Sequence, residues 1–406
     1  MIKWHASFLF SAVLLSILVA SKALAQSQIL ELVCLQAADD FVDPEMNGID
    51  WPGACRAAQA SLTNGEPLAD VADDLLGALD LSHTRFLSSD HADLAILSSV
   101  FADAPHLKAA LREEGGPPLL RGAGFTTMQI DGKLFVNGVL DGSAAEEAGL
   151  HVGDEILDDG GAGFSAVWRD DRGPRAFTAD VLIRRTANGP KMSLPMQVTS
   201  QDALERLYAA TEASFRVIER GQTRIAYLRG WSMISRGTGG PRSILEDGIA
   251  KGRFATVDAF VFDARGLVGG GGPDLLDAFF APSHVATSFL ARGADWEESP
   301  GFDSDMPLFI LTDGRTRSAA EIMVHIAKSR GLATLVGQTT AGALTAGRLS
   351  LLLERNGLYL AVARIRVEGN ELEGKGIEPD LPAPGIARYG DGQDPAIERA
   401  LDAASH

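Results

Sequence analysis

The chain has 406 residues, 46% of them apolar, and its 54 acidic and 36 basic residues give a formal net charge of −18. This length predicts two or three domains, each with a hydrophobic core. The acidic balance, without any basic stripe, would repel a phosphate backbone and argues against nucleic acid as a partner. Metal-ligand spacings such as Cys-x-x-Cys or His-Glu-x-x-His do not occur, so we expect no metal and no cofactor.

The first 25 residues are typical of a secretory signal peptide. Lys3 precedes the uncharged run 8–20, and Ala23-Leu24-Ala25 offers a small-residue cleavage site. The run is shorter than the roughly 20 residues that cross a bilayer, and no later stretch is long and apolar enough to be a second span. We therefore expect a periplasmic or secreted protein with no stable membrane span after signal removal. An uncleaved membrane anchor is the alternative.

Residues 26–117 predict an N-terminal helical region. Apolar residues recur every three or four positions through 29–41, 68–79 and 94–111. The glycines and prolines of 115–118 end this pattern. Cys34 and Cys55 could form one disulfide in an oxidising compartment or remain two buried thiols.

Residues 118–200 predict a second domain of short strands, including 126–130 and 134–139. The loop Gly122-Ala123-Gly124-Phe125 and the segment 142–157, which ends in Val-Gly-Asp-Glu-Ile-Leu, together resemble a PDZ domain. That resemblance implies that the loop offers backbone N–H groups to the C-terminal carboxylate of a protein or peptide, while the peptide adds to a strand.

Residues 201–406 predict a layered α/β domain. Apolar runs of strand length at 224–228, 257–263, 308–312 and 335–337 alternate with helical segments, and 395–404 predicts a terminal helix. The expected fold class is thus an α/β core with an N-terminal helical region and an inserted PDZ domain.

The first candidate site is the start of a helix at Ser318. An apolar strand ends at Thr312, and Ser318-Ala-Ala-Glu321 follows a glycine-containing turn. N–H groups at a helix start favour negative charge, so Ser318 could be a nucleophile and the N–H of Ala319 could receive an oxyanion. The alternative is a capping box, which needs no catalysis. The same tetrapeptide occurs at Ser143–Glu146, where we expect only a helix start.

A second feature is the run of four glycines at 269–272, which follows the strand expected at 257–263 after five residues. Such a run carries an entropic cost and suits a backbone that must approach a ligand closely, although a flexible loop is the alternative. The run lacks the Gly-Lys-Ser/Thr ending of a P-loop, which excludes that phosphate-binding motif.

These segments resemble the C-terminal processing (tail-specific) serine proteases over roughly residues 41–381. The matching segments occur in the family's order: 263–270, 313–321, 336–342 and 376–380. Asp50-Trp51 and 80–87 resemble the helical region of that family. The resemblance implies a serine endopeptidase.

The family has two catalytic styles, and the sequence distinguishes them. In the Ser–Lys style a lysine follows the nucleophile helix, but Ala343 occupies that position here and no lysine lies between Lys328 and Lys375. The Ser–Lys dyad is therefore absent. Lys375 as a replacement base remains an alternative that no motif supports.

The tricorn-like style uses a Ser-His pair ahead of the PDZ-like part and a glutamate after the nucleophile. Ser82-His83 and Glu373 match these elements, although Glu371 and Glu378 flank the glutamate. The resemblance implies that His83 is the general base for Ser318 and that Ser82 and Glu373 orient it. The implied oxyanion donors are the backbone N–H groups of Gly270 and Ala319.

The main rival hypothesis is a catalytically inactive scaffold of the same fold that binds peptides or lipids. The missing dyad lysine motivates it.

Overall fold

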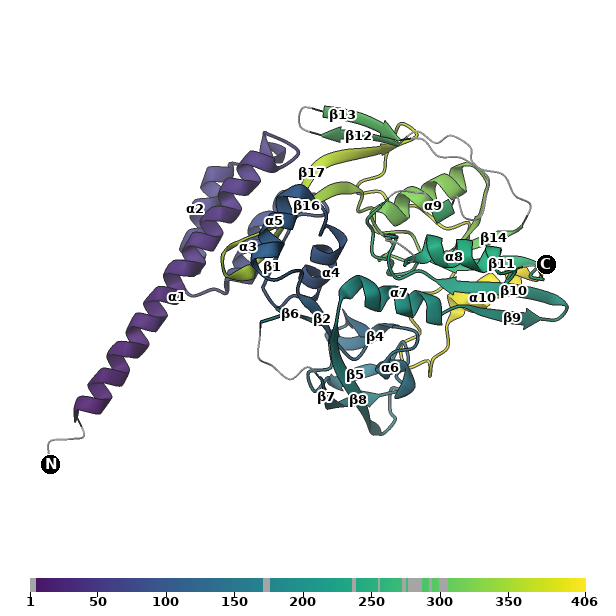
Figure 1. Ribbon diagram of the computed structural model, residues 1–406, viewed down its shortest axis with the longest axis horizontal. Coiled ribbons are helices and arrows are strands. Elements are labelled where there is room, and N and C mark those ends of the chain that lie inside the picture. The colour runs from purple at the N-terminus through teal and green to yellow at the C-terminus, as the bar shows by residue number, and fades with distance from the viewer. Residues whose placement is uncertain are drawn as a thin grey trace.

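The computed structural model describes residues 5–170, 176–235, 239–254, 256–271, 275–276, 287–291, 294–298 and 306–406 (Figure 1). Within these ranges the strands form sheets of six, six and seven strands. The expected signal segment, 1–25, falls largely on residues whose side chains lie outside this description. In the described part of the chain we find no helix with the length and apolar character of a membrane span.

The N-terminal third is mainly helical. Its elements are α1 (His5–Asp40), η1 (Met46–Gly48), α2 (Trp51–Thr63), α3 (Leu68–Gly77), α4 (Ala92–Val100) and α5 (Pro105–Glu113). Ile29, Leu30 and Val33 of α1 are fully buried and pack in one cluster with Leu76 of α3. A Cys34–Cys55 disulfide ties α1 to α2, which decides between the two states that the sequence left open.

One strand in this region was not expected from its helical periodicity. β1 (Arg85–Leu87) pairs antiparallel with β17 (Gly357–Val367), more than 250 residues further along the chain. The six-stranded sheet that contains β1 and β17 also includes β12 (Thr287–Ala291), β13 (Ala294–Glu298), β16 (Thr345–Leu351) and β18 (Asn370–Glu371). The short helix η3 (Leu353–Arg355) lies between β16 and β17. Because Ser82 and His83 directly precede β1, this sheet carries them to the C-terminal half of the chain.

The seven-stranded sheet spans the region of the expected PDZ domain. Its elements are β2 (Leu119–Gly122), β3 (Phe125–Ile130), β4 (Lys133–Val139), α6 (Ala144–Glu147), β5 (Glu155–Asp158), β6 (Ser165–Val167), β7 (Ala176–Arg184) and β8 (Lys191–Gln201). The strand order is β3-β4-β5-β7-β8-β2-β6, so β3 is an edge strand. Buried Phe125, Val136, Val181 and Val198 form its core.

The remaining sheet contains the four strands expected at 224–337. It consists of β9 (Arg216–Arg220), β10 (Thr223–Arg229), β11 (Ala259–Asp263), β14 (Leu308–Thr312), β15 (Thr334–Gly337) and β19 (Leu381–Pro382). All pairings from β10 to β19 are parallel, and β9 is antiparallel. Parallel strands covered on both faces read as continuous apolar runs, which is why the sequence predicted them.

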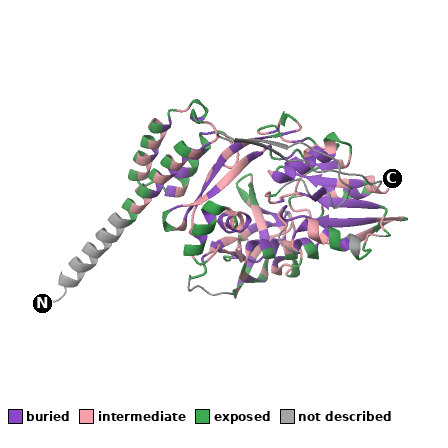
Figure 2. Cartoon of the chain, turned by 45° about the horizontal axis from the view of Figure 1, so that its top comes forward, coloured by how far each residue is buried: buried purple, intermediate pink, exposed green. Residues whose placement is uncertain are grey.

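Helices cover both faces of this sheet, whose strands are largely buried in Figure 2. Ala226 and Leu228 of β10 face the cluster that includes α9 (Ala319–Ser329). Ile225 and Tyr227 face α10 (Pro395–Ala404). The helices not yet named are α7 (Ala203–Ala213) and α8 (Pro241–Ala250). The mixed α/β fold expected from the sequence is confirmed.

Candidate active site

Ser318 lies in a strained turn between β14 and α9. Its φ of 61° and ψ of −131° are unusual for a residue other than glycine. Such backbone conformations cost about 1–3 kcal/mol and persist only where surrounding contacts enforce them. Ser318 precedes the first residue of α9, yet its hydroxyl makes no capping hydrogen bond. The hydroxyl is thus left available at the surface of the turn.

The second copy of the tetrapeptide, Ser143–Glu146, differs from the first in its backbone conformation and hydrogen bonds. Ser143 has an extended backbone, and its hydroxyl accepts a hydrogen bond from the N–H of Glu146 at 3.3 Å. The Glu146 carboxylate in turn accepts from the N–H of Gly142 at 2.6 Å. The Ser143 hydroxyl thus caps the start of α6, while the carboxylate bonds the residue before the N-cap and not the N–H of Ser143 that a capping box would use. A serine hydroxyl therefore caps the helix at Ser143 and not at Ser318.

Glu321, the last residue of the tetrapeptide at Ser318, has a role that the sequence did not reveal. Its buried carboxylate accepts hydrogen bonds from Thr340 Oγ1 at 2.5 Å and from the N–H groups of Gly342 and Ala343 at 2.8 Å each. Ser318 N–H then donates to the carbonyl of Ala343 at 2.9 Å. Burial raises the pKa of Glu321. Glu321 thus fixes the loop against which the backbone of Ser318 is held.

Ser82, His83 and Glu373 meet although 291 positions separate Ser82 from the glutamate. Glu373 accepts hydrogen bonds from Ser82 N–H at 2.7 Å, Ser82 Oγ at 2.9 Å and Leu344 N–H at 2.5 Å. Ser82 Oγ lies 2.8 Å from His83 Nδ1. Of the flanking glutamates, Glu371 instead pairs with Arg364 at 3.1 Å.

This network fixes the tautomer of His83. Ser82 donates its hydroxyl proton to Glu373, so its oxygen must accept from His83 Nδ1–H. Thr345 Oγ1 donates to the carbonyl of Ser82 at 2.9 Å and lies 3.1 Å from the same Nδ1, where it can only accept. The lone pair of the imidazole is therefore on Nε2. Nothing in the sequence around Thr345 signalled this role.

Burial lowers the pKa of His83 to about 3, and the positive charge of Arg317 contributes. The imidazole is consequently neutral near pH 7, the form that can accept a proton. Its ring also packs edge-on against Tyr359, with ring centroids 5.3 Å apart.

Ser318 and His83 line the same cavity, of about 230 Å³. Its walls are otherwise mostly apolar and include Leu87, Ile96, Leu97, Val100, Val268 and Tyr359. Among the described residues, Ser318 Oγ makes no hydrogen bond to His83. Catalytic hydrogen bonds are often long in the absence of substrate and tighten in the complex.

The glycine run lies against the nucleophile. A Cβ on Gly269 would come within 2.6 Å of Ser318 Cβ and 3.3 Å of Ala319 N. At Gly270, the expected oxyanion donor, a Cβ would instead meet Ile234 and Val100. The glycine in contact with Ser318 is thus Gly269, which the sequence could not select within the run. Gly272 lies outside the described residues.

The alternative base Lys375 lies away from this cavity. Lys375 is exposed, and its ammonium donates to the carbonyl of Glu371 at 2.8 Å. Ala343, at the position of the dyad lysine, does line the cavity. The geometry therefore gives Lys375 no role as a base.

The loop Gly122–Phe125 connects β2 to β3, and all four residues are buried. The N–H of Ala123 already donates to the carbonyl of Ala162 at 2.9 Å. Gly124 has a φ of 105° and packs against Ser143. The loop is thus enclosed in the seven-stranded sheet.

Comparison with known proteins gives a consistent result. Residues 224–383 match the model of peptidase family S41. The chloroplastic carboxyl-terminal-processing peptidase 1 of Arabidopsis thaliana is 26% identical over 340 residues, which are 77% of this chain and 63% of that protein. The carboxyl-terminal-processing protease of Synechocystis sp. is 23% identical over 333 residues, with 79% and 71% covered. The chain thus spans just under two thirds of the Arabidopsis relative.

Solved structures share the fold. A photosystem II D1 C-terminal processing protease has a TM-score of 0.52 at 19% identity, with 92% of this chain and 98% of that chain covered. Mature CPAF has a TM-score of 0.55 at 14% identity, with 94% and 96% covered. At these identities the likeness bears on the fold alone. Together these comparisons show that the chain is similar to peptidase family S41 over residues 224–383 and to carboxyl-terminal-processing peptidases over most of its length.

Proposed function

We propose that this chain is an exported serine endopeptidase in which Ser318 is the nucleophile and His83 the general base. The observation that carries the proposal is the shared cavity: an uncapped serine hydroxyl and a neutral imidazole with its lone pair on Nε2 both line it. The similarity to peptidase family S41 and to carboxyl-terminal-processing peptidases supports protein or peptide substrates. The catalytic style without the dyad lysine, and the roles of the individual residues, are part of the proposal.

In this mechanism Ser318 Oγ attacks the carbonyl carbon of a peptide bond as His83 Nε2 takes its proton. The C–N bond then breaks, and the same proton passes to the leaving amine. Water, activated by His83, hydrolyses the acyl-enzyme. Glu373 stabilises the transient imidazolium through Ser82, because the Glu373–Ser82–His83 chain lets the positive ring donate toward a carboxylate.

The tetrahedral intermediate would place its negative charge near the start of α9. The N–H of Ala319 is one proposed donor and the glycine run supplies the other, with Gly270 expected from the sequence. Loss of one such donor typically lowers the rate about 100- to 1000-fold.

The seven-stranded sheet is proposed to act as a PDZ domain. Its edge strand β3 pairs only with β4 among the described strands, so an extended peptide could add to its free side. The loop of Gly122, Ala123, Gly124 and Phe125 would then take the peptide's C-terminal carboxylate. Because these residues are buried, this capture requires the loop to open.

A fluorophosphonate probe and a denatured protein substrate test the proposal. We expect labelling at Ser318 and cleavage by the wild-type chain, no cleavage by Ser318→Ala or His83→Ala, and cleavage by Lys375→Ala. Retained cleavage in Ser318→Ala, or loss in Lys375→Ala with retention in His83→Ala, would refute the assignment.

One observation favours the rival scaffold function: Ser318 and His83 make no direct hydrogen bond among the described residues. A folded wild-type chain that binds peptides or lipids but neither reacts with the probe nor cleaves protein would support that function instead.

A further inference from the structure

Arg229, the last residue of β10, is a buried cation that makes no ion pair among the described residues, although its charge acts on Asp141 and Asp263. Only 8% of its surface is exposed. Its guanidinium lies 3.8 Å from the ring of Trp231, and its Nε is buried with no acceptor. Within the described part of the chain, no carboxylate forms an ion pair with it. A buried guanidinium normally has such a partner, because leaving a charge desolvated and unpaired is costly.

Arg229 lines a cavity of about 500 Å³ that is distinct from the one at Ser318. The cavity lies where β3 and β4 face the core sheet and the segment 384–396. Arg265 and Arg315 also face it, so three guanidinium groups are concentrated there in an otherwise acidic chain.

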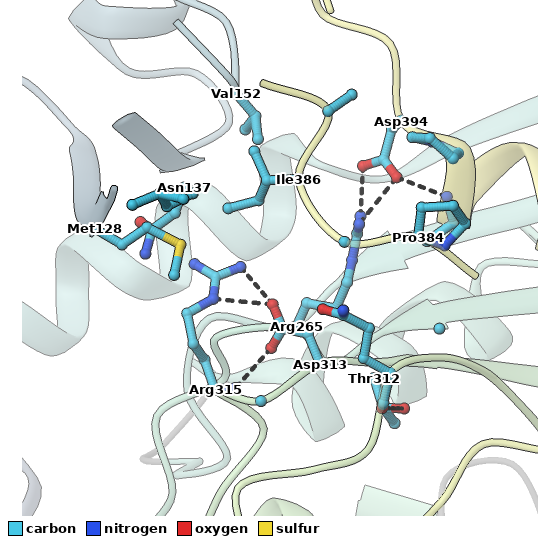
Figure 3. A pocket seen from close by; sticks show the side chains of 18 of the residues that line it. Met128, Asn137, Val152, Arg265, Thr312, Asp313, Arg315, Pro384, Ile386 and Asp394 are labelled. Atoms are coloured by element: carbon cyan, nitrogen blue, oxygen red, sulfur yellow. Dashed lines mark hydrogen bonds and ion pairs between the residues drawn. The ribbon is translucent and has the colours of Figure 1, made fainter. Parts of the chain in front are cut away.

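The carboxylates of this cavity are already paired with the other two arginines. Asp313 accepts from Arg315 Nε at 2.9 Å and Nη2 at 2.6 Å. Asp394 accepts from both terminal nitrogens of Arg265 at 2.9 and 2.8 Å. Figure 3 shows both pairs joined by dashed lines. Arg229 is thus the guanidinium of this cavity that retains its donors.

The opposite wall suits an extended peptide. Met128, Gln129 and Ile130 of β3 line the cavity, and β3 is the edge strand whose free side can pair with another strand. Met128 is 36% exposed, so an apolar side chain is accessible beside this edge. Backbone hydrogen bonding from β3 and a guanidinium from the core therefore converge on one space.

We propose that Arg229 binds a carboxylate of a peptide that lies along β3. Arginine forms two parallel hydrogen bonds to a carboxylate, and burial strengthens such charge-assisted bonds. The site differs from the buried loop Gly122–Phe125, which does not line this cavity. The inference rests on the proposed function in taking a peptide as the ligand, and it makes Arg229 a specificity determinant contributed by the core.

A purely structural role is the competing explanation. Arg229 stacks on Trp231, and its charge acts on Asp141 and Asp263. However, Asp141 is engaged by Trp231 Nε1 at 3.2 Å and Arg216 at 3.8 Å, and Asp263 by Arg265 at 2.7 Å. A structural role predicts that Arg229 substitutions change stability but not the discrimination between peptides.

Fluorescence anisotropy on the full chain carrying Ser318→Ala tests this without hydrolysis. Three labelled decapeptides with one apolar sequence are compared: a free C-terminal acid, its C-terminal amide, and the amide with one internal glutamate. We expect one of the two acidic peptides to bind more tightly than the plain amide. The peptide that does so identifies whether the bound carboxylate is the C-terminus or a glutamate side chain. Arg229→Gln should weaken binding of the preferred acidic peptide about 10- to 100-fold, the effect of losing a hydrogen bond to a charged group.

Arg216→Gln is the matched control, because Arg216 also stacks on an aromatic ring, Tyr227 at 4.0 Å, but does not line the cavity. It should leave the discrimination unchanged. If Arg229→Gln does not fold, Met128→Glu replaces it, because a carboxylate on the exposed part of the opposite wall should also weaken acidic peptides.

Equal binding of the three peptides by the parent chain, or unchanged discrimination in the folded Arg229→Gln or Met128→Glu variant, would overturn the inference. Probe labelling and proteolysis of the Arg229-containing wild type are measured separately. If the chain discriminates between the peptides but neither reacts with the probe nor cleaves protein, the peptidase proposal is refuted and the binding site stands. If the chain cleaves protein but does not discriminate between the peptides, the binding site is refuted and the peptidase proposal stands.

Discussion

The tetrapeptide Ser-Ala-Ala-Glu occurs twice, and replacing the serine of each copy by alanine should separate capping from catalysis. Ser318→Ala removes a hydroxyl that makes no capping bond. Ser143→Ala removes a hydroxyl that accepts from Glu146 N–H and donates to the Gly124 carbonyl, both at 3.3 Å. Each variant loses the same atom, a serine Oγ, from the same four-residue sequence.

The expected magnitudes follow from these contacts. Loss of an N-cap serine typically costs about 1 kcal/mol, and both bonds at Ser143 are long, so about 0.5–1 kcal/mol is expected. That corresponds to a fall in Tm of a few degrees or less, since about 1 kcal/mol shifts a domain of this size by about 2–4 °C. Ser318→Ala should change stability by less than about 0.5 kcal/mol. Its rate should fall on the order of a million-fold, as removal of a serine nucleophile does elsewhere.

Thermal melting and hydrolysis of a denatured protein are measured for both variants beside the wild type. Ser143→Ala should melt lower and retain its rate, and Ser318→Ala should melt like the wild type and lose it. The reasoning fails if Ser318→Ala still cleaves, or if it is the less stable of the two.

Three further predictions concern the site and the N-terminal helices. Gly269→Ala should lower kcat by about 100-fold or more, because its methyl group would come within 2.6 Å of Ser318 Cβ. The control Gly77→Ala, whose methyl group would have no atom within 4 Å, should keep the wild-type kcat. Equal rates in the two variants would contradict this prediction. His83 has a folded pKa of about 3, below its unfolded value of 6.5, so the unfolded state binds the proton first and stability falls as pH drops from 6.5 toward 3. The slope is at most about 1.4 kcal/mol per pH unit, and urea unfolding of His83→Gln between pH 4 and 7 should show a shallower dependence than wild type. Cys34→Ser should cost about 3 kcal/mol, the chain entropy of a loop of this size, and a urea midpoint equal to that of the oxidised wild type would argue against the disulfide.

Local patterns were sufficient for much of the fold. The strands at 224–228, 257–263, 308–312 and 335–337 were predictable because parallel strands buried on both faces form continuous apolar runs. Short strands such as β1 were missed, because Arg85–Leu87 becomes a strand only by pairing with β17, far along the chain. The residues around β1 in the sequence contain no information about which distant strand it will pair with.

The sequence by itself determined which residue types stand at the candidate site: a serine at a helix start, a Ser-His pair, a late glutamate, and alanine where the dyad lysine would be. Only the tertiary structure decided how they are used. It gave identical tetrapeptides a capping role at Ser143 and a strained, uncapped backbone at Ser318. It also left the buried Nε of Arg229 without an acceptor among the described residues. The physical reason is that backbone strain, burial and hydrogen-bond partners depend on contacts between segments distant in sequence, and folding alone brings those segments together.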